Sequence, residues 1–161
     1  MFGGMMMATA AQAGLRILVV ENEFWLRLDA EETLLELGHE VVGWASRACI
    51  AISEAERTRP DLILMDIQLD GTRDGIEAAR VIRDMFGIPS LFVTGSADPA
   101  LRKRAMKTEP LGYLQKPFTS AQLQSIFKDF CKTSNGDASR PVSNLTWRDQ
   151  RYSPSAPRRA S

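Results

Sequence analysis

Five short apolar runs, each of strand length, alternate along this sequence with longer stretches in which apolar residues recur every three or four positions. The short runs are rich in β-branched and aromatic residues, which is typical of buried strands. The run Leu62–Ile67 is apolar at odd and even positions alike and delivers one carboxylate, Asp66, near its end, as expected for a strand covered on both faces. Strands are therefore predicted at Arg16–Val20, Glu40–Ala45, Asp61–Met65, Ser90–Val93 and Gly112–Leu114.

The amphipathic stretches predict five helices between and after these strands. The first is expected from Glu23 to Leu37, where Gly38 ends it. Its predicted inward face consists of Leu26, Ala30, Leu34 and Leu37, and its predicted outward face of Arg27, Glu31, Glu32 and Glu36.

The second helix is expected to be capped by Ser46 and to last until about Thr58, because Pro60 prevents its continuation. A third helix is predicted over residues 75–86, and a short basic fourth helix after Pro99. The inward residues of the third are expected to be Gly75, Ile76, Ala79, Ile82 and Phe86, and those of the fifth Leu123, Ile126, Phe127 and Phe130.

Strands that alternate with helices in this way predict an α/β fold, a doubly wound (βα)5 sandwich around a parallel five-stranded sheet of order 2-1-3-4-5. Right-handed crossovers leave few other orders. In this order strands one, three and four are neighbours, so the residues just past the strands meet at one edge of the sheet. They are Glu21, Asn22, Asp66, Thr94 and Lys116.

The expected edge combines oxygen ligands, a hydroxyl and an ammonium around the carboxylate of Asp66. Such a set suits Mg²⁺ and a phosphoryl group, because Mg²⁺ is bound by one or two carboxylates and bridges phosphoryl oxygens. Lys116 can neutralise phosphoryl charge, and the Thr94 hydroxyl can donate to a phosphoryl oxygen. Asp66 is the expected nucleophile, because carboxylates form acyl phosphates and need no deprotonation at neutral pH.

Length and composition suggest one domain with additional segments. The 161 residues are 44% hydrophobic, which is enough for a core. We expect a disordered leader over residues 1–14, the folded domain over residues 15–131, and a basic tail rich in Ser, Pro and Arg over residues 132–161, also expected to be disordered. The 20 basic and 20 acidic residues balance overall, although the body is mildly acidic. The tail leaves no room for an output domain, and its aromatic residues, Trp147 and Tyr152, are expected to be disordered or to dock on the body or a partner.

Four further features are interpreted without a catalytic role. Cys49 and Cys131 are expected to be free thiols, which indicates a cytoplasmic location. No stretch approaches the roughly 20 apolar residues that a membrane helix needs. His39 is expected to be an exposed turn residue. The basic residues between Arg102 and Lys107 form either a solvated helix face or a binding surface.

Several segments, taken together, resemble the receiver domains of two-component response regulators. They are ILVVENE at 17–23, DLILMDIQL at 61–69 followed by Asp74 and Gly75, FVTG at 92–95 and YLQKPF at 113–118. They follow the family's order and cover residues 15–131. The FVTG segment also resembles the single-domain FATGUY subgroup, which works with histidine kinases in alphaproteobacterial stress and signalling relays. The resemblance implies a flavodoxin-like fold.

The resemblance also implies roles for individual residues. Asp66 is then the phosphoacceptor, Lys116 the conserved-type lysine of the family's site, and Thr94 and Tyr113 the switch pair. The implied metal ligands for Mg²⁺ are Glu21, Asn22, Asp66 and the main-chain carbonyl of Gln68. A cis peptide bond between Lys116 and Pro117 is also implied.

One position departs from the family pattern. The second residue of the acidic pair is Asn22, so the site has one negative charge fewer and weaker metal binding is expected, or help from Glu21 or Glu23. A pseudo-receiver that binds partners without phosphorylation is therefore a second hypothesis.

Three classes of function follow. The first is a stand-alone receiver, not an enzyme, that accepts a phosphoryl group from a sensor histidine kinase or a phosphotransfer protein. It then switches a partner-binding surface on the fourth helix, fifth strand and fifth helix, or acts as a phosphate sink. The second is the pseudo-receiver, and the third is a hydrolase, disfavoured because the sequence shows no cap or separate general acid. Neither nucleic acid nor a membrane is expected as a partner.

Overall fold

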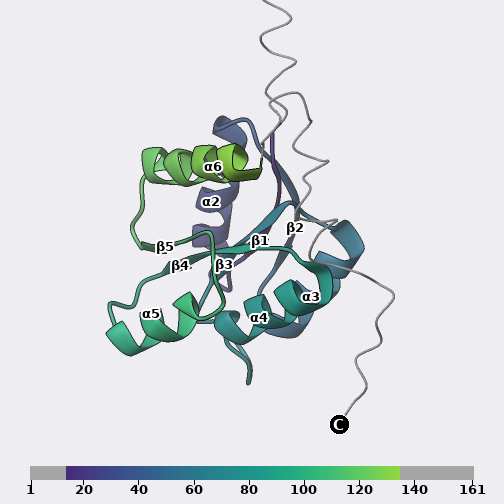
Figure 1. Ribbon diagram of the computed structural model, residues 1–161, viewed down its shortest axis with the longest axis vertical. Coiled ribbons are helices and arrows are strands. Elements are labelled where there is room, and N and C mark those ends of the chain that lie inside the picture. Colours follow the sequence, from purple (N-terminus) through teal and green to yellow (C-terminus); the bar gives the residue numbers. More distant parts are fainter. Residues whose placement is uncertain (1–13, 135–161) are drawn as a thin grey trace, which may run out of the picture.

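The computed structural model describes residues 14–134, which form one α/β unit (Figure 1). The expected leader therefore lies outside the described residues except for Gly14, and so does the tail beyond Ser134, including Trp147 and Tyr152. The last helix continues to Ser134, three residues past the expected end of the domain.

Five parallel strands form the central sheet in the order β2-β1-β3-β4-β5, which confirms the predicted fold class and strand order. The central strands are buried along almost their whole length because helices cover both faces of the sheet. The bounds are β1 Arg16–Val20, β2 Glu40–Ala45, β3 Leu62–Asp66, β4 Ser90–Thr94 and β5 Gly112–Gln115.

Helices follow each strand, as the sequence predicts, and their ends carry recognisable signals. Asp74 caps α4 by accepting a hydrogen bond from the Glu77 amide at 3.0 Å, and Gly87 ends that helix in a left-handed conformation. Pro99 begins α5 directly after the capping Asp98. The bounds are α2 Phe24–Glu36, α3 Ala48–Thr58, α4 Gly75–Phe86, α5 Pro99–Met106 and α6 Ser120–Ser134.

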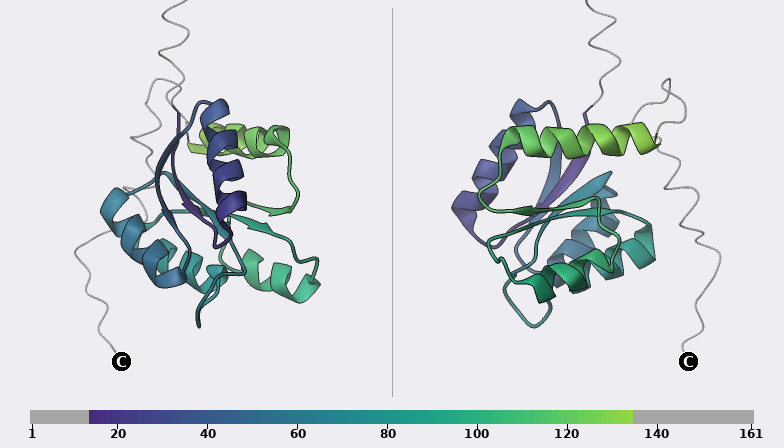
Figure 2. Two further views of the ribbon diagram at one scale, coloured as in Figure 1. Left: turned by 180° about the vertical axis from the view of Figure 1, so that it is seen from behind. Right: turned by 60° about the vertical axis from the view of Figure 1, so that its left-hand side comes forward.

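Two hydrophobic layers sandwich the sheet, with α2 and α6 on one face and α3, α4 and α5 on the other (Figures 1 and 2). Alternate residues of each strand enter opposite layers, because side chains of a strand point to opposite faces in turn. In β3, for example, Leu62 and Leu64 pack towards α2 and α6, whereas Ile63 and Met65 pack towards the other layer. In residues 14–134, no helix has the length and apolar character needed to span a membrane.

The inward face of α2 differs from the prediction at two positions. Leu26 is 39% exposed, whereas Arg27, expected on the outward face, is 9% exposed. The Arg27 guanidinium lies 3.8 Å from the centre of the Trp44 ring and 5.1 Å from that of Phe24. Two aromatic rings thus cover the cation, and Glu31 Oε1 lies 3.9 Å from its Nε.

Two smaller predictions are also wrong. Arg47, not Ser46, is the N-cap of α3, and no side chain bonds the helix start; Arg47 instead makes an isolated β-bridge with Asp70. His39 is half-buried, because its Nδ1 accepts a hydrogen bond from the Leu15 amide at 3.0 Å and its ring contacts Phe127 edge-on. This burial lowers the pKa of His39.

Candidate functional site

The register of the sheet brings the ends of four strands together at its carboxyl edge. Val20 pairs with Met65, so Glu21 follows β1 at the level of Asp66. Asp66 in turn pairs with Val93, which places Thr94 one residue further along the neighbouring strand. Thr94 pairs with Gln115, and its carbonyl accepts a hydrogen bond from the Lys116 amide at 2.7 Å. The expected gathering of these side chains at one edge therefore follows directly from the strand pairing.

Asp66 is a nearly buried carboxylate, 4% exposed, with a hydrogen bond on each oxygen. Its Oδ1 accepts from the Gln68 amide at 3.1 Å, and its Oδ2 accepts from Lys116 Nζ at 3.3 Å. Burial, together with the negative charge of Glu21, raises the pKa of Asp66 to about 6, despite the opposing charge of Lys116. At neutral pH most of Asp66 remains a carboxylate and so keeps its nucleophilic form.

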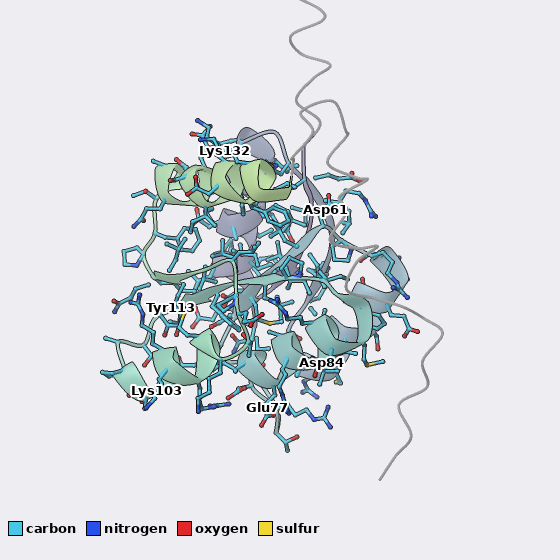
Figure 3. The ribbon with its side chains drawn as sticks, viewed as in Figure 1. Asp61, Glu77, Asp84, Lys103, Tyr113 and Lys132 are labelled. Carbon is cyan, nitrogen blue, oxygen red and sulfur yellow. The ribbon has the colours of Figure 1, made fainter. Side chains whose placement is uncertain are left out.

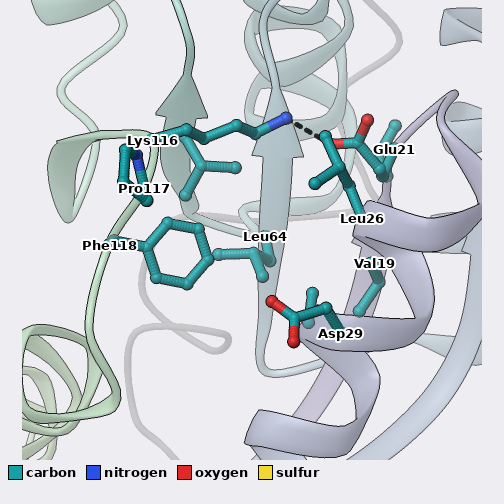
Figure 4. Close-up of a pocket in the computed structure, with 11 residues that line it drawn as sticks. Val19, Glu21, Leu26, Asp29, Leu64, Lys116, Pro117 and Phe118 are labelled. Atoms are coloured by element: carbon teal, nitrogen blue, oxygen red, sulfur yellow. Dashed lines mark hydrogen bonds and ion pairs between the residues drawn. The ribbon is translucent and has the colours of Figure 1, made fainter.

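Lys116 bridges the two carboxylates of the site. Its Nζ donates to Glu21 Oε2 at 2.6 Å (Figure 4). It also donates to Asp66 Oδ2 at 3.3 Å, so one cation neutralises part of a paired negative charge. Burial alone would lower the pKa of Lys116, but the hydrogen bond that Lys116 donates to Glu21 and the charges of both carboxylates raise it. Lys116 is therefore a permanent cation beside Asp66.

Asn22 lies next to Glu21 but is oriented by a residue that the sequence analysis missed. Its Nδ2 donates to Oδ1 of Asp70, in the loop after β3, at 3.2 Å. With the amide nitrogen engaged, the Asn22 oxygen is left available to a ligand. Asp70 is visible in the sequence as the second acidic residue of DIQLDG, but no pattern in the sequence indicates that it contacts Asn22.

The oxygen donors at the carboxyl edge of the sheet decide whether Mg²⁺ could bind there. In residues 14–134, no group of three or more His, Cys, Asp or Glu side chains is arranged to hold a metal ion. The edge instead offers the two carboxylates of Glu21 and Asp66, and next to Glu21 the amide of Asn22. Hard oxygen donors with one or two carboxylates suit Mg²⁺ when phosphoryl oxygens and waters complete its shell. The residues present therefore fit this metal.

The loop after Asp66 is held close to the site by a glycine and an ion pair. A Cβ on Gly75 would lie 1.9 Å from the Asp66 carbonyl oxygen, so only glycine allows α4 to begin this close to β3. The Gly75 amide donates to the Ile67 carbonyl at 2.8 Å. Asp74 accepts from Arg104 of α5 at 2.8 Å, which links the loop to the next helix. Arg102, Lys103 and Arg104 are all exposed, and Arg104 has an acidic partner in Asp74.

Thr94 and Tyr113, the expected switch pair, lie on adjacent strands. Thr94 is fully buried, and its hydroxyl oxygen accepts from the Ser96 amide at 3.2 Å. Tyr113 is partly buried and packs against the hydrophobic layer that contains α5. Figure 3 labels its side chain. Its hydroxyl is buried without a hydrogen-bond partner among the described residues, and Arg102 lies 5.3 Å from its ring centre. Burial raises the pKa of Tyr113.

A cavity of about 310 Å³ adjoins the site on the α2 side of the sheet. Apolar side chains of β1, β3 and α2 form most of its wall, and the connection after β5 closes it. Figure 4 shows Leu26, Leu64 and Phe118 around this space, with Lys116 and Glu21 joined above them. The Lys116–Pro117 bond at its rim is cis, as the resemblance implied. The exposed Leu26, expected in the core, is one wall of this cavity.

Comparison with known relatives agrees with the geometry. The transcriptional regulatory protein PdtaR of Mycobacterium tuberculosis is 37% identical over 108 residues, which cover 67% of this chain and 52% of PdtaR. The phyllosphere-induced regulator PhyR of Methylorubrum extorquens is 34% identical over 118 residues, which cover 73% of this chain and 43% of PhyR. The chain thus spans about half the length of the curated relatives it matches.

Solved structures give the same picture. The signal receiver domain of a modulated diguanylate cyclase from Desulfovibrio desulfuricans has a TM-score of 0.71 and 30% identity, covering 74% of this chain and 95% of that one. The anti-anti-sigma factor PhyR from Bartonella quintana has a TM-score of 0.63 and 27% identity, covering 81% of this chain and 55% of that one. The family model of the response regulator receiver domain matches residues 17–128 of the sequence. With the five-stranded fold and the site at its carboxyl edge, these matches show that the chain belongs to the response regulator receiver domain family.

Proposed function

We propose that this protein is a signalling phosphoacceptor that takes a phosphoryl group onto Asp66 from a sensor histidine kinase or a phosphotransfer protein. The observation that supports this most directly is the position of Lys116 Nζ, 2.6 Å from Glu21 and 3.3 Å from Asp66. A permanent cation beside this buried carboxylate can neutralise part of the charge that an added phosphoryl group brings.

The transfer step involves one bond made and one broken. A carboxylate oxygen of Asp66 forms the P–O bond while the P–N bond to the donor histidine breaks. The bonding electron pair leaves with the imidazole nitrogen, which can then take up a proton from solvent. Lys116 stays protonated and shifts its hydrogen bond towards the new phosphoryl oxygens, and the Thr94 hydroxyl moves towards another of these oxygens and donates to it.

Mg²⁺ is the proposed cofactor, held by Glu21, Asn22, Asp66 and the main-chain carbonyl of Gln68. When bound, it neutralises charge on the transferring phosphoryl oxygens. Asp70 supports this arrangement by holding the Asn22 amide nitrogen at 3.2 Å, so that the amide oxygen can face the metal. The ammonium group of Lys116 neutralises part of the negative charge of Glu21 and Asp66.

The proposed output is a change of surface and not turnover of an external substrate. Drawing Thr94 towards the phosphoryl group empties space behind β4 that the Tyr113 ring can enter, because its hydroxyl has no partner to lose among the described residues. The downstream protein partner would then read the face made by α5, β5 and α6. A phosphate sink uses the same chemistry without a partner.

The proposed receiver domain is the α/β unit expected over residues 15–131, whose last helix ends at Ser134. A cytoplasmic location is proposed because Cys49 and Cys131 are both free and because phosphohistidine donors act there. Neither nucleic acid nor membrane contact forms part of the proposal.

Incubation with acetyl phosphate and Mg²⁺ followed by intact mass measurement tests the proposal. The wild-type chain should gain ~80 Da, the mass of one phosphoryl group on a carboxylate nucleophile. Asp66→Asn should abolish the adduct, whereas Asp84→Asn, an exposed carboxylate of α4, should retain it.

The pseudo-receiver remains the second candidate, because Asn22 leaves the edge with two carboxylates. No adduct on the wild-type chain with acetyl phosphate or with a phosphorylated histidine donor would support it. An adduct that persists in the Asp66→Asn variant would instead contradict the assignment of the phosphoacceptor.

A further inference from the structure

Helix α2 carries a second apolar face that points away from the sheet. Phe24, Leu28 and Leu35 are 55%, 37% and 61% exposed and lie within one narrow stripe, because they are four and seven residues apart. Trp25, 77% exposed, lies beside the first turn of this stripe. A surface helix ordinarily presents polar side chains on this side, so the stripe needs a cover.

An aromatic cluster widens the stripe at its start. The rings of Phe24 and Trp25 meet edge to face with centres 5.2 Å apart, and Trp44 of the edge strand β2 is 53% exposed. Arg27 lies against both Phe24 and Trp44, and its Nε and Nη1 are buried without hydrogen-bond partners in residues 14–134. Arg27 therefore packs against two exposed rings, and Trp25 packs against one of them; Trp and Arg are enriched among the residues that dominate binding surfaces.

Acidic side chains border this surface, which we call the α2 stripe (Phe24, Trp25, Leu28, Leu35 and Trp44). Asp29, Glu32 and Glu36 of the same helix are exposed, and Arg27, the sole basic residue of α2, is buried. A complementary occupant must therefore combine apolar or aromatic side chains with positive charge. A second copy of the chain would set the same acids against one another, which is unfavourable.

We propose that residues 140–152 of this chain, with the sequence RPVSNLTWRDQRY, occupy the α2 stripe. The segment pairs the apolar side chains of Val142, Leu145, Trp147 and Tyr152 with three arginines, Arg140, Arg148 and Arg151. The rings would cover the stripe and the guanidinium groups would meet the bordering acids and the faces of the exposed rings. This inference does not depend on phosphorylation of Asp66.

The geometry of the fold allows the contact. Helices α2 and α6 cover the same face of the sheet and both return from its carboxyl edge (Figure 2). His39, just after α2, contacts Phe127 of α6 with ring centres 4.9 Å apart, so the end of α2 lies near α6. From Ser134 to Arg140 the chain can span about 20 Å, and the α2 stripe is about 16 Å long. Since the tether is short, the effective concentration of the segment is high.

Indole N–H signals in two-dimensional NMR spectra of the full chain provide the test, because Trp25, Trp44 and Trp147 report on both sides of the contact. Reversing the charge of Arg140, Arg148 and Arg151 to Glu should shift the Trp25 and Trp44 signals. Salt at about 1 M, where the Debye length is about 3 Å, should shift them in the same direction. The matched control reverses Arg158 and Arg159, outside the segment, and should leave both signals in place.

The reciprocal variant carries Leu28→Gln and Leu35→Gln, which change exposed side chains and should leave the fold intact. In this variant the Trp147 signal should move to its position in an isolated 140–152 peptide. The proposal is overturned if charge reversal leaves the Trp25 and Trp44 signals unmoved, or if Trp147 already matches the peptide in the wild-type chain. Signals that move with protein concentration would assign the α2 stripe to a second copy and overturn it as well.

Discussion

Replacing Asp66 with Asn should stabilise the fold at neutral pH, although it removes the proposed nucleophile. The folded-state pKa of Asp66 is raised from 3.8 to about 6, first by burial and then by the charge of Glu21. A carboxyl group whose pKa is raised on folding contributes stability below its unfolded pKa and loses it as the pH rises through the folded pKa. At pH 7 the ionised Asp66 therefore costs stability, and an amide, which does not ionise, removes that cost.

The magnitude follows from the difference between the two pKa values. About two pH units, at roughly 1.4 kcal/mol each, correspond to about 3 kcal/mol. This figure already includes the attraction of Lys116, which lies 3.3 Å from Asp66 and opposes the rise of its pKa. We expect the variant to gain about 1–3 kcal/mol in free energy of unfolding at pH 7.

Urea unfolding in metal-free buffer measures this gain. The difference between Asp66→Asn and wild type should be greatest at pH 7 and shrink as the pH is lowered from about 6 towards about 4. Adding Mg²⁺ should also shrink it, because a metal that binds only the native wild-type site stabilises that form. Asp84→Asn should change the free energy of unfolding by less than about 0.5 kcal/mol. A variant no more stable than wild type at pH 7 would refute the argument that the ionised form of Asp66 destabilises the fold.

Three further outcomes are expected. Asn22→Asp should tighten Mg²⁺ binding by about tenfold, seen as quenching of Trp44 fluorescence, because it adds a negative charge to the site; equal affinity would mean that another residue already supplies it. Gly75→Ala should lower the free energy of unfolding by more than about 2 kcal/mol in urea titrations, since the new Cβ collides with the Asp66 carbonyl; an unchanged midpoint would show that α4 can shift. Beryllofluoride with Mg²⁺ should change amide hydrogen exchange mainly within residues 94–118, and a change confined to α2 and α3 would contradict the proposed switch.

The sequence by itself determined the fold and the positions that gather at the carboxyl edge. Each strand was visible as an apolar run, and Glu21, Asp66 and Lys116 each come directly after or at the end of one. In a parallel sheet all such ends meet at one edge, so local pattern and chain order are enough to place these residues together. The inward faces of α4 and α6 were predictable for the same reason, because one periodic apolar stripe has one sheet to cover.

The tertiary structure alone decided how the site is charged and oriented. The raised pKa of Asp66 arises from burial and from Glu21, which is 45 positions earlier in the chain. The contact between Asn22 and Asp70 spans 48 positions. Neither leaves a local signature, because electrostatic and hydrogen-bond terms depend on distances that form only when β1 and β3 pair.

Helix α2 illustrates the limit most clearly. Its first turns, FWLRL, are apolar on several sides, so periodicity could not say which side faces the sheet. The prediction placed Leu26 inside and Arg27 outside, and the structure shows the reverse. Trp44, on a strand that follows the helix, covers the Arg27 guanidinium at 3.8 Å and makes its burial tolerable. Burial of a long polar side chain depends on such a distant neighbour, and only the packed fold supplies it.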